Sequence, residues 1–246
     1  MDLLIDLGNT RLKWATLDAG VLRPGGVFAH GDVALDAALA HEWGRLARVA
    51  RVFAASVRGA DEERRLDAYA HARFGQHVRF VRSPAQALGI RNAYAQPGTL
   101  GVDRFLALAA LHAQDARPQV LASVGTALTV DALAADGTHL GGIILPSPTL
   151  MRASLHARTA RIPPVDGHWH ALPESTADGV HAGSLYAAAG AIDRFVAAAA
   201  ARMEAAPSLF VTGGGAEELL PLLPTATRVH DLVLRGLARW AEADAG

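Results

Sequence analysis

The chain contains no cysteine among its 246 residues. Disulfides, thiol catalysis and zinc–thiolate sites are therefore excluded, and this composition fits a cytoplasmic protein. Basic residues do not exceed acidic ones, at 23 against 24, and no basic run interleaved with aromatic residues occurs. Because nucleic-acid binding usually requires such a basic surface, we expect small-molecule or protein partners and no nucleic acid.

Long apolar runs are lacking as well. The apolar stretch after Met1 has no basic leader and is interrupted by Asp2 and Asp6, unlike a secretory signal. The alanine-rich run 197–206 is too short, and too charged at its end, to cross a bilayer. We therefore expect a soluble protein with no membrane partner. Hydrophobic residues make up 51% of the chain, enough for a large core in one domain or in two halves.

What the chain does contain, at its start, is an apolar strand that leads directly into an acidic, glycine-containing turn. The segment comprises Asp6, Leu7, Gly8, Asn9, Thr10, Arg11, Leu12 and Lys13. A carboxylate at a strand end can hold hydrated Mg²⁺, and a glycine lets backbone N–H groups approach phosphate oxygens. Thr10 and Lys13 add a hydroxyl and a positive charge. Taken alone, the same pattern also fits an ordinary hairpin.

Two later segments repeat this pattern. Residues 120–131 contain a strand, the Gly125-Thr126 turn and a second strand, and residues 209–218 contain a strand, a triple glycine and a helix start. Two opposed Gly-Thr turns can hold a polyphosphate from both sides, and the backbone of Gly213 and Gly214 offers a flat surface to an adenosine. Each turn alone is more often structural, but together they predict nucleotide binding.

Hydrophobic periodicity predicts strands followed by alternating helices and strands, and this order appears twice. The expected strands are 2–7, 10–17, 26–30, 51–57, 77–82, 119–124, 127–133, 139–145, 208–212 and 226–229. The expected helices are 33–47 (beginning near Asp32), 60–73, 101–114, 147–158, 176–204, 216–222 and 231–241. The repetition predicts an α/β protein with two similar lobes, residues 1–116 and 117–246, and a nucleotide cleft between them.

The three turns, with Gly101-Val102-Asp103-Arg104, resemble the phosphate 1, phosphate 2 and adenosine motifs of the acetate kinase, sugar kinase, Hsp70 and actin superfamily. More narrowly, the chain resembles type III pantothenate kinases, also called the Bvg accessory factor family. The resemblance spans nearly the whole chain and includes Tyr94, Gly141-Gly142, Ser175-Thr176 and Thr212–Gly215. It implies an actin-like (ribonuclease H-like) fold, ATP with Mg²⁺ as cofactors, and a homodimer.

The resemblance also implies residue roles. Asp103 would take the proton of the pantothenate hydroxyl and Arg104 would bind the substrate carboxylate, with Gly101, Val102, Tyr94 and Thr176 also at the substrate. Asp6 would bind Mg²⁺, and residues 6–13 and Thr126 the ATP phosphates. Residue chemistry leaves alternatives open: Asp103 as a helix N-terminal acid, Arg104 as a surface charge, Tyr94 as a half-buried aromatic, and Thr176 as a helix cap in 175-STAD-178. Asp131 either assists the metal or closes a turn.

Two departures from the family pattern affect these expectations. Ser123 stands where the family commonly has an acid that holds a monovalent cation, K⁺ or NH₄⁺. A hydroxyl is a weaker cation ligand, so either the dependence on this cation is weakened here or another oxygen, such as a backbone carbonyl, takes the role. Ser147-Pro148 replaces a usual glycine and should reshape a loop.

The resemblance therefore implies ATP-dependent phosphorylation of pantothenate to 4′-phosphopantothenate, the first step of coenzyme A synthesis. A kinase of another small hydroxylated substrate and a non-catalytic, nucleotide-binding transcriptional accessory protein are the alternatives. P-loop and protein-kinase signatures are lacking. The apolar helix 185–199 could serve either as an interface or in internal packing.

Overall fold

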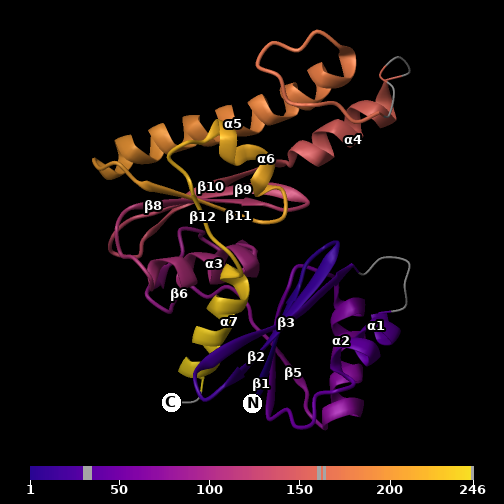
Figure 1. The fold of residues 1–246 in the computed structure, drawn as a ribbon. Helices are drawn as coiled ribbons and strands as arrows, with labels where there is room; N and C mark the ends of the chain where they lie inside the picture. The colour runs from indigo at the N-terminus through magenta and orange to yellow at the C-terminus, as the bar shows by residue number, and fades with distance from the viewer. Residues whose placement is uncertain (30–34, 160–161, 163–164, 245–246) are drawn as a thin grey trace. The chain divides into compact units, whose positions relative to one another are not determined.

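The computed structural model describes residues 1–29, 35–159, 162 and 165–244 (Figure 1). The helices are α1 (Leu35–Trp43), α2 (Ala60–Phe74), α3 (Val102–His112), α4 (Pro148–Arg158), α5 (Thr176–Met203), α6 (Ala216–Leu219) and α7 (Leu232–Ala243), with 3-10 turns η1 (Pro97–Thr99) and η2 (Leu220–Leu222). The strands are β1 (Asp2–Leu7), β2 (Arg11–Asp18), β3 (Val21–Ala29), β4 (Arg51–Ser56), β5 (Val78–Phe80), β6 (Gln86–Ala87), β7 (Ile90–Arg91), β8 (Gln119–Val124), β9 (Ala127–Leu133), β10 (His139–Pro146), β11 (Ser208–Thr212) and β12 (Thr227–Arg228).

The chain forms two compact units: unit 1 comprises Met1–Asp115 and Asp231–Gly246, and unit 2 comprises Ala116–His230. Within the described residues, the sheet of unit 1 has the strand order β3-β2-β1-β4-β5. Side chains alternate along a strand, so Leu3, Ile5 and Leu7 of β1 all point to one face, where they share a core with α1 and α2. Asp6 therefore points to the other face, the side on which α3 and α7 pack (Figure 1).

Unit 2 repeats this sheet order as β10-β9-β8-β11-β12. The buried side chains Val120, Ala122 and Val124 of β8 pack against Leu185 and Ile192 of α5. One face of the alanine-rich helix thus serves in internal packing, because alanines bring its backbone close to the sheet. The two matching sheets confirm the predicted α/β class with two similar lobes.

The central strands of the two sheets correspond residue by residue. β1 and β8 each pair antiparallel with the next strand, β2 or β9, and parallel with β4 or β11. Both central strands have six residues, and the fifth is Asp6 in β1 and Ser123 in β8. Ser123 therefore occupies in unit 2 the sheet position that Asp6 occupies in unit 1.

The compact units differ from the expected lobes at the end of the chain. The expected boundary at 116/117 lies next to the observed one, but α7, expected in the second lobe, belongs to unit 1. Its apolar face, which includes Leu232, Leu234 and Leu237, is buried. At Gly236 the helix touches α3 so closely that a Cβ atom would lie 2.2 Å from the Leu106 carbonyl oxygen. The chain thus comes back to unit 1 at its C-terminal end, and a single boundary in the sequence cannot describe two units of which one is built from two segments.

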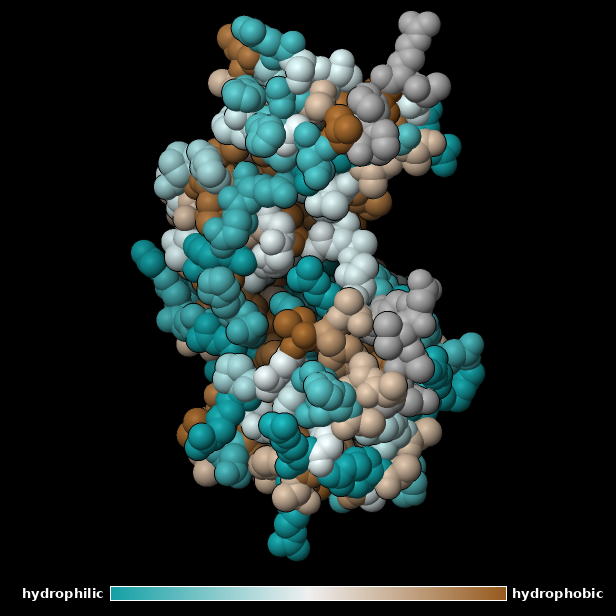
Figure 2. All heavy atoms as spheres, turned by 45° about the vertical axis from the view of Figure 1, so that its right-hand side comes forward, coloured by the Kyte–Doolittle hydropathy of each residue, from teal (hydrophilic) through white to brown (hydrophobic). Residues whose placement is uncertain are grey.

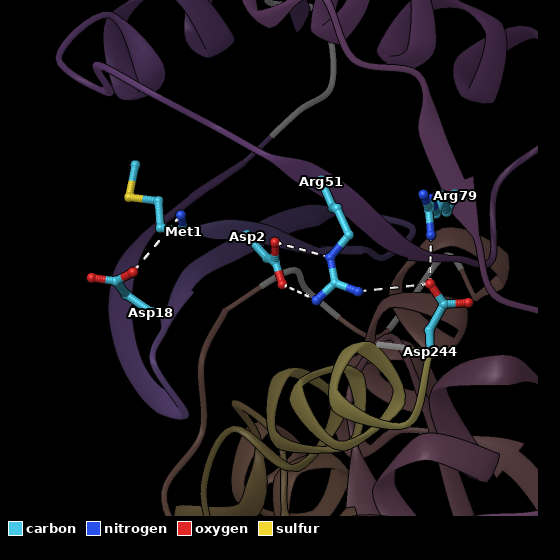
Figure 3. A network of polar contacts seen from close by, with 6 residues as sticks. All are labelled: Met1, Asp2, Asp18, Arg51, Arg79 and Asp244. Carbon is cyan, nitrogen blue, oxygen red and sulfur yellow. Dashed lines mark hydrogen bonds and ion pairs between the residues drawn. The ribbon is translucent and has the colours of Figure 1, made fainter. Parts of the chain in front are cut away.

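Ion pairs hold the end of α7 to the sheet of unit 1 (Figure 3). Arg51 of β4 donates two hydrogen bonds to the Asp2 carboxylate, one of them from Nε at 3.2 Å. Its Nη1 lies 3.8 Å from the carboxylate of Asp244, which Arg79 also contacts. The arginine thus links β1, β4 and the C-terminal end of α7.

Most predicted elements are present with ends shifted by few residues. The expected start of the first helix near Asp32 lies outside the described residues. Strand β3 begins at Val21 rather than 26, because a hairpin at Ala19-Gly20, both with positive φ, pairs it with all of β2. The β6–β7 hairpin was not predicted, and the expected helix 216–222 changes to a 3-10 turn at Leu220. No helix within the described residues is long and apolar enough to span a bilayer.

Candidate active site

The first predicted phosphate turn is a tight hairpin between β1 and β2. Leu7 pairs with Leu12, and both are buried, so their burial fixes the hairpin register. The Gly8 N–H donates to the Arg11 carbonyl at 3.0 Å. Asn9 and Thr10 at the tip and Arg11 beside it are exposed, while Lys13 is half-buried opposite Asp6. The segment thus presents backbone, hydroxyl and positive charge at the carboxyl end of β1.

The carboxylate of Asp6 is surrounded by charged groups of unit 1. Burial raises its pKa to about 7, the negative charges of Asp103 and Asp231 raise it as well, and Lys13 opposes the shift. A buried carboxylate close to two others binds a proton or a cation readily, since either neutralises repulsion. Asp103 and Asp231 come from the first turn of α3 and the residue before α7, so both helices bring an acid towards β1.

The carboxylate of Asp6 suits an Mg²⁺ ion whose other ligands are mostly water and the phosphate oxygens of a bound nucleotide. Among the residues that the structure describes, no three His, Cys, Asp or Glu side chains come together as a ready metal cage. Mg²⁺ keeps several waters and usually takes one or two protein carboxylates together with phosphate oxygens. Asp6, half-buried at the strand end, suits this role.

Gly101 makes room for the side chain of Asp103. A Cβ atom at Gly101 would lie 2.6 Å from Oδ1 of Asp103, so any larger residue there would displace the carboxylate. Val102 begins α3 and is buried, which anchors this turn, and the Phe105 N–H donates to the Gly101 carbonyl at 3.1 Å. The carboxylate is therefore held by the backbone shape of the Gly101–Asp103 turn.

Arg104 is almost fully buried, with only 6% of its surface exposed, so it is not the surface charge that residue chemistry allowed. Its Nη1 donates to the Tyr94 hydroxyl at 3.2 Å, and its guanidinium carbon lies 5.8 Å from the centre of the Tyr94 ring. Asn92 holds the loop of Tyr94: its side-chain oxygen accepts from the Tyr94 N–H, and its amide donates to the Pro84 and Pro97 carbonyls. Tyr94 and Arg104 are thus one positioned pair.

In unit 2, Thr126 lies exposed in the two-residue turn between β8 and β9, where the Gly125 N–H donates to the Ala127 carbonyl at 2.9 Å. Ser123, two residues earlier, pairs with Thr129 on β9 and Thr212 on β11. Three hydroxyl residues thus lie side by side across β9, β8 and β11. Their oxygens are neutral, so they attract cations less than a carboxylate does.

The triple glycine lies against the end of β8. Gly213 has φ of +94°, and a Cβ atom there would lie 2.3 Å from the Val124 carbonyl oxygen. The Gly215 N–H donates to the same oxygen at 3.1 Å, and a Cβ atom at Gly215 would lie 2.8 Å from Cγ1 of Val124. A side chain would clash at both positions, so the triple-glycine loop and the Gly125-Thr126 turn adjoin within unit 2.

Thr176 is the first residue of α5, and the capping role belongs to its neighbour. The Ser175 hydroxyl accepts from the Asp178 N–H at 3.1 Å and donates to the Asp178 carboxylate at 2.7 Å. Hydrogen bonds from the His168 N–H and from Ser175 lower the pKa of Asp178. The capping alternative thus applies to Ser175 rather than to Thr176.

Asp131 neither ends a strand nor closes a turn. It lies within β9, only 2% exposed, and its Oδ1 is 2.9 Å from Nε2 of the buried His139. The strand continues to Leu133 and pairs with β10 beyond it, which explains the error in the expected position.

Sequence reasoning missed several positioning groups. Asp231 was assigned to a helix of the other lobe, and its αL backbone, φ 54°, leaves no sequence signal. Arg58 donates to the Asn9 carbonyl at 3.3 Å, and Arg228 contacts the triple-glycine loop. The Asn92-x-Tyr94 spacing was the one usable signal, because asparagine side chains often accept from the N–H two residues ahead.

The chain is similar to known proteins over nearly its whole length. A family model described as Type III pantothenate kinase matches residues 2–198. A Type III pantothenate kinase of Xanthomonas campestris pv. campestris (strain 8004) is 47% identical over 242 residues, which cover 97% of this chain and 96% of that protein.

Solved structures give the fold. A Campylobacter jejuni protein described as belonging to the Baf family of transcriptional activators aligns with a TM-score of 0.61 at 20% identity, covering 99% of this chain and 98% of that one. The activator of 2-hydroxyisocaproyl-CoA dehydratase from Clostridium difficile, with bound ADPNP, has a TM-score of 0.53 at 12% identity, covering 99% and 95%. These likenesses support the predicted actin-like and sugar-kinase fold class.

Proposed function

The chain belongs to the type III pantothenate kinase family, and we propose how its own residues carry out the ATP-dependent phosphorylation of pantothenate to 4′-phosphopantothenate, the first step of coenzyme A biosynthesis. The observation that carries the proposal is the placement of Asp103 beside Asp6, with the buried Arg104 next in sequence. An acid near the attacking hydroxyl and an acid for the metal are what phosphoryl transfer requires.

Asp103 is the general base in this proposal. Its carboxylate accepts the proton of the pantothenate hydroxyl as that oxygen attacks the γ-phosphorus of ATP, the bond from that phosphorus to the β,γ-bridging oxygen breaks, and ADP leaves. Lys13 and the backbone N–H groups of Asn9 and Thr10 stabilise the ATP phosphate oxygens. Mg²⁺, held by Asp6, would neutralise charge on the phosphates. Arg suits the substrate carboxylate because its fork can form two parallel hydrogen bonds, and Tyr94 orients that fork.

Unit 2 supplies the remaining nucleotide contacts in this proposal. The Thr126 hydroxyl binds an ATP phosphate, and the flat backbone of Gly213 and Gly214 supports the adenosine. Thr176, first in α5, contacts pantothenate. The glycine-only geometry at Gly213 and Gly215 supports this assignment, because a loop that admits no side chain leaves its backbone accessible.

A monovalent cation, K⁺ or NH₄⁺, should affect this enzyme only weakly, since Ser123 and its neighbours Thr129 and Thr212 are neutral ligands. We also propose a cytoplasmic homodimer that binds no nucleic acid. Large apolar side chains exposed on unit 2 support the dimer: Leu150, Leu155, Leu172 and Tyr186. On the face drawn in Figure 2, hydrophobic residues form separate groups among hydrophilic ones. Light scattering should give twice the mass of the chain, and Leu172→Asp, which is 89% exposed as leucine, should lower it.

The test is to incubate the protein with MgATP and pantothenate and to detect 4′-phosphopantothenate by mass spectrometry. A panel of other small alcohols separates pantothenate from other acceptors, and K⁺, NH₄⁺ and Na⁺ are compared in parallel. We expect Mg²⁺-dependent product with pantothenate and a change of less than about threefold among the monovalent cations. ATP binding without product from any acceptor would support the transcriptional accessory alternative instead, and strong K⁺ activation would reject the assignment of Ser123.

A further inference from the structure

Arg228, on the short edge strand β12, uses all of its side-chain nitrogens in contacts around the triple-glycine loop, and one of them binds the loop itself. Nη2 donates to the Gly213 carbonyl at 2.7 Å. Nη1 lies 3.4 Å from the Val211 carbonyl oxygen and 3.2 Å from that of Val229, and Nε donates to Glu217 at 3.0 Å. One guanidinium thus joins the end of β11, the glycine loop, β12 and α6.

This arrangement follows from the sheet register. Val211 of β11 pairs with Arg228 of β12, and β12 has only two residues, so the backbone ladder ends there. The Val229 N–H makes the last ladder bond, to the Val211 carbonyl at 2.9 Å. Beyond it, the arginine side chain takes over and reaches the carbonyl of Gly213. The planar fork of arginine presents donors in several fixed directions, which a lysine cannot do.

The loop needs such a restraint because glycine loses more conformational freedom on ordering than any other residue. Val124 limits the loop on one side, as the contacts at Gly213 and Gly215 show. Arg228 fixes the peptide that follows Gly213 from its carbonyl side. The side chain of Arg228 is 20% exposed, so its contacts are shielded from water more than those of an ordinary surface arginine.

We propose that Arg228 is a positioning residue for the nucleotide: by holding the Gly213 carbonyl, it keeps the loop flat and ready for adenosine. The proposal rests on the assignment of Gly213 and Gly214 to the adenosine of ATP. Arg228 acts through the loop backbone, so its loss weakens nucleotide binding and leaves the chemical step and pantothenate binding unchanged.

Glu217 provides a matched control. Glu217→Gln removes the charge that pairs with Arg228 but leaves the arginine free to donate to the three carbonyls. Glu217 is 70% exposed, so this ion pair contributes little by itself. If Arg228 acts through the Gly213 carbonyl, Glu217→Gln retains nucleotide affinity and Arg228→Gln does not.

The experiment uses the full chain and measures the Kd of ADP and of AMPPNP by calorimetry, with kcat and both KM values. For Arg228→Gln we expect both Kd values and the KM for ATP to rise about tenfold, with kcat and the KM for pantothenate within twofold. Arg228→Lys should recover only part of the loss, and Glu217→Gln should stay within twofold of wild type.

Unchanged nucleotide affinity in Arg228→Gln would overturn the inference, as would equal losses in ATP binding, pantothenate binding and kcat. If Arg228→Gln does not fold, hydrogen exchange at residues 211–216 in Arg228→Lys decides. Faster exchange there, together with weaker ADP binding, supports the inference, and unchanged exchange or binding contradicts it. Failure of the wild-type protein itself to bind ADP or AMPPNP would reject the assignment of the loop instead.

Discussion

Asp6 and Asp103 interact: burial of the Asp6 carboxyl, and then the negative charge of Asp103, raise the pKa of Asp6 to about 7. The two acids come from different elements, the end of β1 and the first turn of α3. One is proposed to hold Mg²⁺ and the other to accept a proton. Their closeness has a cost in stability that can be measured without substrate.

Asp6→Asn should stabilise the metal-free protein. Between about pH 4 and pH 7 the folded state keeps a proton on Asp6 that the unfolded chain has lost, so wild-type stability falls as the pH rises through this range and then levels off. In Asp6→Asn there is no such proton, so the stability of the variant does not fall with pH for this reason. Because Asp6 is partly exposed, we expect a gain of only about 1–3 kcal/mol at pH 8, vanishing towards pH 4.

Urea unfolding in EDTA at pH 5, 6, 7 and 8 measures this difference. Asp61→Asn, at an exposed acid in the first turn of α2, is the control and should show no such pH dependence. A destabilised Asp6→Asn at pH 8 would contradict the assigned electrostatics.

Gly101→Ala should lower kcat by about 10- to 100-fold, since the new Cβ would lie 2.6 Å from Oδ1 of Asp103 and displace it. The backbone of Gly101, φ −51°, suits alanine, so we expect unfolding free energy to change by less than about 1 kcal/mol. Steady-state kinetics and urea unfolding measure both. Gly98→Ala is the matched control, because a Cβ atom there meets nothing within 4 Å. Normal kcat in Gly101→Ala would show that Asp103 needs no fixed position.

Tyr94→Phe should raise the KM for pantothenate about tenfold, because the hydroxyl that accepts from Arg104 is removed and a hydrogen bond to a charged group contributes about 1.5 kcal/mol. The KM for ATP should stay within twofold. Initial rates at varied pantothenate and varied ATP distinguish the two. If ATP and pantothenate KM values rise together, Tyr94 supports the fold rather than the substrate contact.

Arg51→Gln should destabilise unit 1 by about 2 kcal/mol, because it leaves the mostly buried Asp2 carboxylate without its partner and frees the end of α7 from Arg51 (Figure 3). Arg64→Gln removes the exposed Arg64–Asp61 pair and should change stability by less than about 0.5 kcal/mol. Urea unfolding compares them. Equal effects of the two variants would show that the buried network adds nothing beyond a surface pair.

Sequence reasoning predicted the fold class and most elements because their signals are local. Short, nearly continuous apolar runs mark β1 and β8, and helical spacing marks α3. The sequence did not show that α7 belongs to unit 1, because its apolar face by itself does not say which element it packs against. In the structure, the close contact of Gly236 with Leu106 identifies α3 as its partner. The start of β3 was missed because Pro24, Gly25 and Gly26 resemble a loop, although Pro24 and Gly26 pair with β2 on either side of a bulge at Gly25.

In the candidate site, too, residues with a local sequence pattern were predicted, and residues that depend on contacts made in the fold were not. Gly8, Asp103 and Thr126 were selected because turns and helix starts have sequence patterns of their own. Arg228 and Asn92 were not, since their importance depends on carbonyl groups that come near only after folding. The turn-closing role for Asp131 was wrong because the sequence shows a strand but not the contact of this carboxylate with the buried His139.

The most direct test of the proposed mechanism is the kcat of Asp103→Asn, measured with saturating MgATP and pantothenate, alongside the Kd of AMPPNP. The account predicts a kcat lower by about 10²- to 10⁴-fold, because the amide cannot accept the hydroxyl proton, with nucleotide affinity close to wild type and an unfolding free energy that is not lowered. A kcat within a few-fold of wild type would contradict the assignment of Asp103 as the base.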